Sequence, residues 1–140
     1  KLNKVGERFG RLPFVQAMTD VTGFGLLGHL SEMCEASNTS AVIHFEDIPF
    51  IDRGMLQLYL DQKCVPGGTH RNWDSYGHKI AGATEEQRLL LADPQTSGGL
   101  LVAVAPESAS EFQQIAKEEG LALQSFGFMI ERQPAIVTVV

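Results

Sequence analysis

The chain has 140 residues, a formal net charge of −6 and a hydrophobic fraction of 44%, which suits one domain with a core of its own. No apolar run approaches the roughly 20 residues needed to cross a bilayer, so the sequence excludes a membrane-spanning segment. Its acidic balance argues against nucleic acid as a partner, because the phosphates would repel the domain; a phosphorylated ligand bridged by a divalent cation stays open.

The cysteines give no sign of a metal or redox site. Cys34 and Cys64 are far apart in sequence and show neither zinc-ligand nor C-x-x-C spacing. We interpret both as reduced thiols and expect a cytoplasmic protein.

The first half of the chain contains one strong helical pattern. Residues 1–13, with three Gly or Pro breakers, look like a connector from a preceding domain, and residues 14–18 predict a strand. Residues 26–36 predict a helix, because their apolar side chains recur at the spacing of one helical face. A second strand, a short helix and a long loop are expected at residues 41–45, 55–60 and 62–75.

The second half begins with a well-marked helix start. Thr84 and Gln87 form a capping-box pattern, and the helix should run to about residue 92 before Pro94 stops it. The continuous apolar run at residues 100–105 suits a strand buried on both faces. The pattern then predicts an amphipathic helix closed by Gly120 and two final strands, at residues 107–119, 121–130 and 135–140.

The order of these elements indicates the fold class. Strands and helices alternate unevenly, and the last two strands have no helix between them, which predicts an antiparallel pair with a bulge near Ser125. This favours an α+β domain with a mixed sheet rather than a regular doubly wound fold.

The first motif with chemical potential is the turn after the first strand. Asp20 precedes Gly23 and Gly25, which allow a close backbone approach to a ligand, and the amides that open the next helix favour an anion. A carboxylate there would repel a bare phosphate, so the arrangement suits a bridging Mg²⁺ ion. It fits equally well a structural turn in which Asp20 is a cap and the glycines serve packing.

A second motif repeats this order between a helix and a strand. Asp93 precedes Thr96, Ser97, Gly98 and Gly99, whose hydroxyls and amides offer donors in a row, as in an anion-binding nest. The alternative is a plain connection in which Asp93 ends the helix region.

A third segment, at residues 65–73, combines two glycines with Arg71 and Asn72. Arg71 could pair with phosphate, and the alternative is a solvated surface loop. His29 falls on the polar side of the first predicted helix, which indicates a surface or capping residue. The remaining histidines have no mutual metal-ligand spacing.

All three segments resemble selenophosphate synthetases in order and in spacing. The stretches concerned are 18–30, 65–72 and 93–101, so the similarity covers the chain after Pro13. It identifies residues 14–140 as the C-terminal domain of such an enzyme and implies a three-layer α/β/α fold, partly ferredoxin-like, related to aminoimidazole ribonucleotide synthetase.

The resemblance also implies a function for the longer protein. Members of the family are homodimers that convert ATP, selenide and water to selenophosphate, AMP and phosphate, and the N-terminal domain of the same chain supplies most of the ATP site. By resemblance Asp20 is a Mg²⁺ ligand. The residues expected to line the nucleotide's phosphates are Thr22, Gly23, Gly25, Thr96, Ser97, Gly98 and Gly99.

One family feature is missing. The family's reactive cysteine or selenocysteine lies in a Cys/Sec-Gly-x-x-Lys segment near its N-terminus, and neither Cys34 nor Cys64 is followed by glycine. We therefore expect no catalytic residue in this chain and no activity of the chain alone. The alternatives are the C-terminal domain of a sister ATP-dependent purine-pathway synthetase and a non-catalytic binding or dimerisation module.

Overall fold

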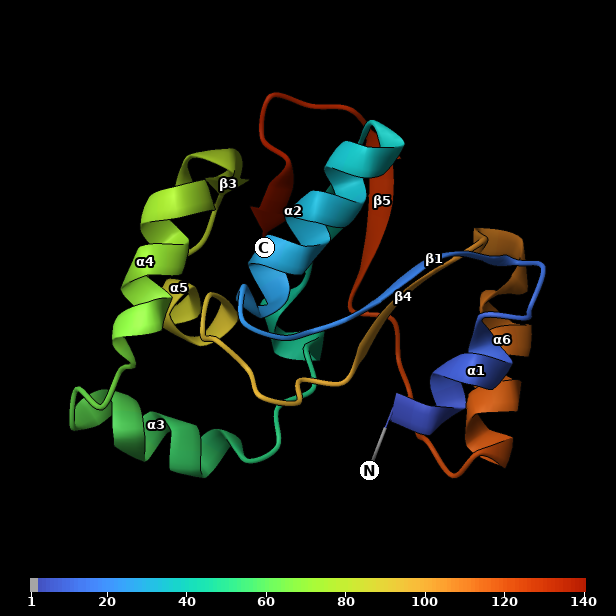
Figure 1. Cartoon of the computed structure of the whole chain (residues 1–140), viewed down its shortest axis with the longest axis horizontal. Coiled ribbons are helices and arrows are strands. Elements are labelled where there is room, and N and C mark those ends of the chain that lie inside the picture. Colours follow the sequence, from blue (N-terminus) through green and yellow to red (C-terminus); the bar gives the residue numbers. More distant parts are fainter. Residues whose placement is uncertain (1–2) are drawn as a thin grey trace.

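The structure, a computed structural model, describes residues 3–140 and has an α+β fold (Figure 1). The helices are α1 (Gly6–Phe9), α2 (Gly25–Ser37), α3 (Arg53–Asp61), α4 (Gly67–Tyr76), α5 (Glu85–Leu91) and α6 (Ala109–Glu118). The strands are β1 (Val15–Asp20), β2 (Thr39–Ile43), β3 (Ile80–Ala81), β4 (Leu100–Val104), β5 (Gly127–Glu131) and β6 (Val137–Val139). No helix within residues 3–140 is long and apolar enough to cross a membrane.

The strands form two separate sheets. β1 and β4 make an antiparallel ribbon, and the other strands form a mixed sheet in the order β3-β6-β2-β5. β2 runs antiparallel to β5 and parallel to β6. The mixed sheet confirms the predicted fold class, but the predicted pairing of the last two strands is wrong, because β2 lies between them.

Helices cover both faces of the β1–β4 ribbon, which gives the predicted α/β/α layering. Leu101 of β4 joins the core formed with α2, whereas its neighbours Leu100 and Val102 pack with α6 on the opposite side. β4 is thus covered on both faces, as its apolar run predicted. Only Leu101 in this strand is buried, and the other side chains are partly exposed. A ribbon of two strands leaves both of its edges open to solvent.

The main core lies between α2 and the four-stranded sheet. Leu27, Leu30 and Cys34, at the spacing of one helical face, are buried against β2 and β6. The helix ends at Asn38, whose φ of 54° is the left-handed conformation of many helix ends. α2 is therefore fixed along its whole length, including the first turn that borders the candidate site.

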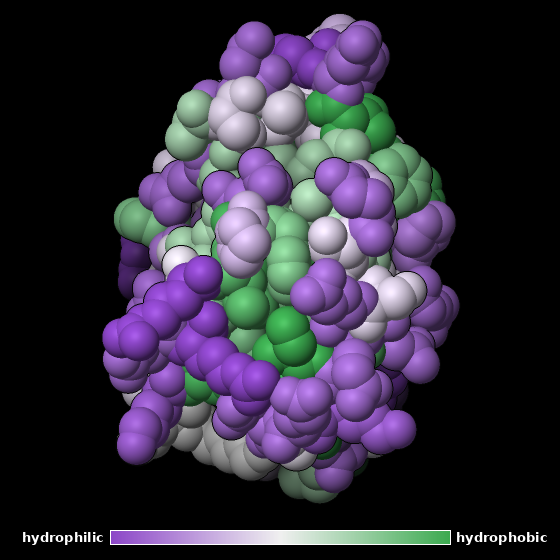
Figure 2. Space-filling model, turned by 90° about the vertical axis from the view of Figure 1, so that its right-hand side faces the viewer, coloured by the Kyte–Doolittle hydropathy of each residue, from purple (hydrophilic) through white to green (hydrophobic). Residues whose placement is uncertain are grey.

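A smaller core joins α1 to α6. The Phe9 and Phe112 rings lie 4.8 Å apart between centroids, with Ala116 buried beside them. Arg8 forms salt bridges with Glu118 and Glu119 at the end of α6. Figure 2 views this side of the molecule, where polar side chains surround a strip of apolar surface. Phe9 lies in the segment that the sequence indicated as a connector, so that segment adds to the packing of the domain.

The predicted loop at residues 62–75 is wrong, because Gly67–Tyr76 forms helix α4. Pro66 occupies the N-cap position with extended backbone angles. Two glycines open the helix and lower its intrinsic propensity, but the buried side chains of Thr69 and Tyr76 anchor it to the domain. Tertiary packing therefore overrides the local preference.

The predicted strand at residues 121–130 is shorter than expected. It begins only at Gly127, because the preceding residues carry the chain from the end of α6 to the far sheet (Figure 1). The change in apolar alternation near Ser125 marks the start of β5, and β5 pairs with β2 in continuous register without a bulge.

Candidate functional site

The two glycine motifs, predicted independently, lie side by side where β1 ends and β4 begins. Asp20 pairs in register with Leu100. Beyond this pair, the Val21 amide donates to the Gly99 carbonyl at 2.9 Å, and the Gly98 amide donates to the Val21 carbonyl at 3.0 Å. The ribbon thus brings both turns to one edge of the domain.

The third segment meets the first two through α4. The Asn72 amide nitrogen donates to the Gly23 carbonyl at 2.8 Å and to the Ala92 carbonyl at 2.9 Å. The Thr69 hydroxyl donates to the Asp93 carboxylate at 3.0 Å. The similarity of the three segments to one family therefore corresponds to one junction in space, and α4 buttresses it. Arg71 is exposed on this helix.

Asp20 has the exposure that a cation ligand requires. It borders a shallow hollow lined by Gly6, Met18, Thr19 and Leu100. Residues 3–140 offer its carboxylate no hydrogen bond or salt bridge, since the Thr19 hydroxyl contacts only the Asp20 carbonyl. The carboxylate is thus free to bind a ligand. No three His, Cys, Asp or Glu side chains cluster in the part of the chain that the structure describes.

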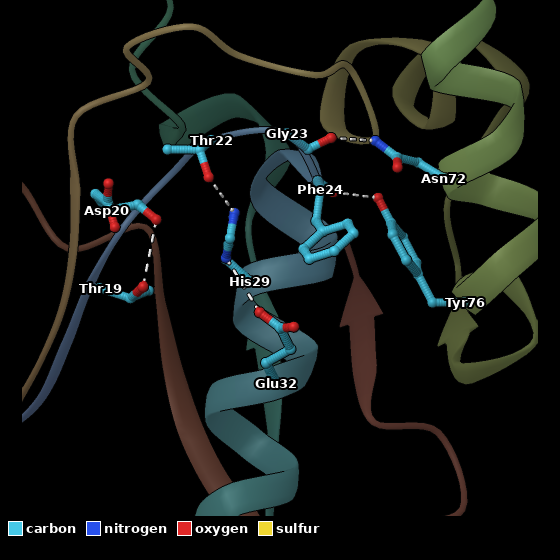
Figure 3. A network of polar contacts seen from close by, with 9 residues as sticks. All are labelled: Thr19, Asp20, Thr22, Gly23, Phe24, His29, Glu32, Asn72 and Tyr76. Carbon is cyan, nitrogen blue, oxygen red and sulfur yellow. Dashed lines mark hydrogen bonds and ion pairs between the residues drawn. The ribbon is translucent and has the colours of Figure 1, made fainter.

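His29 belongs to the site region, and its prediction as a surface or capping residue is wrong. It is 9% exposed, and its ring contacts the Thr22 hydroxyl and the Glu32 carboxylate, each at 3.1 Å (Figure 3). The turn before α2 folds back over the first turns of the helix, and the Phe24 ring lies 5.6 Å from the imidazole. Helical periodicity could not anticipate a cover supplied by residues outside the helix.

The glycines of the two motifs divide into packed and open positions. A Cβ on Gly25 would lie 2.8 Å from backbone atoms of Leu91 and Ala92, and one on Gly98 would lie 2.8 Å from the Val21 carbonyl oxygen. A Cβ on Gly23 or Gly99 would meet nothing within 4 Å. Gly25 and Gly98 therefore allow the segments to pack, whereas Gly23 and Gly99 leave open space at the site.

The polar residues of the second motif divide in the same way. Thr96 and Ser97 are exposed, as a ligand-facing pair would be. Asp93 is held by Thr69 and by the Gln95 amide at 2.7 Å. Burial raises the pKa of Asp93, and these two hydrogen bonds oppose the rise. The carboxylate of Asp93 thus serves the junction itself.

Sequence reasoning missed two residues of this junction, His29 and Tyr76, whereas Asn72 was part of the third predicted segment. The Tyr76 hydroxyl donates to the Phe24 carbonyl at 2.6 Å, directly before α2. One local signal was present, because His29 and Glu32 are three residues apart on a predicted helix, where side chains can meet. The contacts of α4 carried no such signal, since they depend on the tertiary fold.

A comparison of the sequence with known protein families agrees with the fold and with the junction of the three motifs. Residues 8–140 match the family described as AIR synthase related protein, C-terminal domain. The chain belongs to this family.

Individual proteins of similar sequence show which members of the family the chain resembles. The selenide, water dikinase of Pseudomonas aeruginosa is 56% identical over 138 residues, 99% of this chain and 40% of that protein. The proteins of the same name from Pseudomonas putida and Haemophilus influenzae are 53% and 50% identical, again over 99% of this chain and 40% of each relative. The chain thus spans about 40% of the length of these relatives.

Proposed function

We propose that this chain is the C-terminal domain of an ATP-dependent selenophosphate synthetase, which forms selenophosphate, AMP and phosphate from ATP, selenide and water. The observation that carries the proposal is the similarity to selenide, water dikinases along 99% of the chain. The convergence of the three motifs at one junction supports a role in binding the nucleotide's phosphates.

The residues present fit a magnesium–nucleotide complex. Mg²⁺ usually takes one or two protein carboxylates and completes its shell with water and phosphate oxygens. Asp20 offers one exposed carboxylate that has no hydrogen bond or salt bridge within residues 3–140. When bound, the ion would neutralise charge on the transferring phosphate. Thr96, Ser97 and the amides of Gly23 and Gly99 would bind the phosphate oxygens.

The rest of the catalytic apparatus would come from an N-terminal domain of the same protein, and the working enzyme would be a homodimer. Cys34 and Cys64 are both free thiols, which fits action in the reducing cytoplasm. Neither has the sequence context of the family's reactive residue, so we expect no synthetase activity from the 140-residue chain alone.

The direct test is AMP formation from ATP and selenide by the full-length protein. Asp20→Ala should lower turnover roughly 100-fold or more, as loss of a charge-stabilising group at a reaction centre does, while circular dichroism stays unchanged. Asp61→Ala is the matched control, because Asp61 is also exposed and ends α3, which lies away from the β1–β4 ribbon (Figure 1). Near-normal turnover of Asp20→Ala would remove this residue from the mechanism.

Substrate choice separates the proposal from its nearest rival. A purine-pathway synthetase would consume ATP with a ribonucleotide substrate and ignore selenide. A wild-type full-length protein that forms no AMP with selenide would overturn the proposed function. AMP formation by the 140-residue chain alone would overturn the assignment of catalysis to another domain.

A further inference from the structure

A short polar relay leads from the surface of α2 to the turn after β1 (Figure 3). Nδ1 of His29 lies 3.1 Å from Oε2 of Glu32, and Nε2 lies 3.1 Å from Oγ1 of Thr22. The histidine side chain is 10% exposed and that of Glu32 is 59% exposed. The imidazole is therefore enclosed between a solvent-facing carboxylate and a hydroxyl of the candidate site.

Donor chemistry fixes the direction of both contacts. A carboxylate only accepts hydrogen bonds, so Nδ1 of His29 carries the proton that points to Glu32. In the neutral ring Nε2 is then an acceptor, and the Thr22 hydroxyl must donate to it. The hydroxyl proton is thereby turned toward the histidine, and the lone pairs of Oγ1 remain available to a ligand.

Backbone pairing places Thr22 two residues beyond Asp20, at the same edge of the domain. Asp20 and Thr22 flank Val21, whose side chain is 6% exposed and belongs to the main core. Hydrogen bonds to Gly98 and Gly99 hold the backbone of Val21 on both sides. Its two neighbours are consequently fixed at the same edge of the domain.

An oriented acceptor has a definite preference among ligands. Oxygen lone pairs suit Mg²⁺ or a water molecule bound to it, whereas a bare phosphate oxygen requires a donor. The Thr22 hydroxyl donates its proton to His29. Toward a ligand it therefore acts as an acceptor, like the Asp20 carboxylate, and not as the donor that a phosphate oxygen needs.

We propose that His29, held by Glu32, is a positioning residue that fixes the Thr22 oxygen as an acceptor toward the hydrated magnesium ion bound by Asp20. This rests on the proposed function and deepens it. Thr22 serves the cation side of the nucleotide complex, while the second glycine motif serves the phosphates.

Matched variants separate positioning from a merely structural role. Thr22→Val removes the hydroxyl at nearly constant shape, and Thr22→Ser keeps it. His29→Gln places an amide near the position of Nε2 and can still accept from Thr22, whereas His29→Asn places it near Nδ1 and keeps only the contact to Glu32. The probe is Mn²⁺, titrated by electron paramagnetic resonance into the full-length protein with a non-hydrolysable ATP analogue.

We expect Thr22→Val and His29→Asn to weaken Mn²⁺ binding about fivefold, the effect of one ordinary hydrogen bond. Thr22→Ser and His29→Gln should stay within about twofold of the wild type. The double variant Thr22→Val/His29→Asn should bind no more weakly than Thr22→Val, because both changes act through one hydroxyl. Additive losses, or equal losses for His29→Asn and His29→Gln, would contradict positioning.

A second readout needs no ligand. Long-range proton–nitrogen NMR of the 140-residue chain should show His29 protonated at Nδ1 and bare at Nε2; protonation at Nε2 alone would overturn the proposal. If His29→Asn fails to fold, Thr22→Val still tests the proposal. Wild-type Mn²⁺ affinity in Thr22→Val would refute the positioning role and leave the proposed function standing. Absence of Mn²⁺–nucleotide binding by the wild-type protein would overturn the proposed function and this proposal with it.

Discussion

The glycines of the two motifs allow backbone strain and steric exclusion to be measured separately in one junction. Gly25 and Gly99 both have positive φ, at 68° and 89°. A Cβ would meet nothing at Gly99 but would lie 2.8 Å from backbone atoms at Gly25. Gly98 has the close contact without a positive φ, and Gly23 has neither. The four alanine variants therefore form a complete comparison.

The expected losses follow from these two terms. Gly99→Ala should lose about 1–2 kcal/mol of unfolding free energy from the left-handed backbone alone. Gly98→Ala should lose about 1–3 kcal/mol, the usual effect of overpacking. Gly25→Ala carries both terms and should lose roughly 2–5 kcal/mol, because its neighbours are backbone atoms that cannot rotate away. Gly23→Ala should stay within about 0.5 kcal/mol of the wild type.

Urea unfolding of the 140-residue chain, followed by circular dichroism, measures all four values. The slope with urea should be unchanged, so that shifts in midpoint report stability directly. The reasoning would be refuted if Gly25→Ala were no less stable than Gly99→Ala. It would also be refuted if Gly23→Ala were the most damaging change, since nothing near Gly23 opposes a side chain.

Three further predictions test other parts of the structure. In the native chain a small alkylating reagent should modify the exposed Cys64 and spare the buried Cys34, whose pKa is raised by burial. Mass spectrometry measures the modification, and rapid modification of a Cys64→Ser variant would contradict this expectation. Thr84→Ala should destabilise the chain by about 1 kcal/mol through loss of the α5 capping box, and Thr84→Ser should restore most of it. Because burial raises the pKa of Asp93, the folded state binds its proton more tightly than the unfolded state, so this group's contribution to stability falls as pH rises above about 3.9, its ordinary value. The unfolding free energy of Asp93→Asn, measured across acidic pH, should therefore lack the decrease seen in the wild type. Identical pH profiles of the wild type and Asp93→Asn would refute this prediction.

Local patterns predicted the elements whose sequence signal lies within one short segment. The helical face of α2, the capping box that opens α5 and the amphipathic helix closed by Gly120 are all present. Gly120 has a φ of 71°, as a helix-ending glycine should. In each case the signal can be recognised within a single stretch of the sequence, without knowledge of the element's partners.

Elements that depend on residues distant in the sequence could not be predicted from local patterns. Helix α4 is secured by Asn72 and Tyr76, which hydrogen-bond to the turn before α2. The position of β2 between β5 and β6 also depends on chain crossings that no short window contains. The sequence pointed to the motifs of the site, but not to the helix that holds them together.

Motif residues in such a junction need not share one role. Val21, Gly25 and Gly98 hold the segments together, while Asp20 and Gly99 face open space. A glycine within the motif is therefore no indication by itself of contact with phosphate, because removing a side chain can serve the packing of one segment on another. The two roles depend on each other, since the packed residues set the positions of the open ones. A substitution at Gly25 should accordingly impair ligand binding through displacement of Thr22 and Asp20, even though Gly25 itself lies against α5.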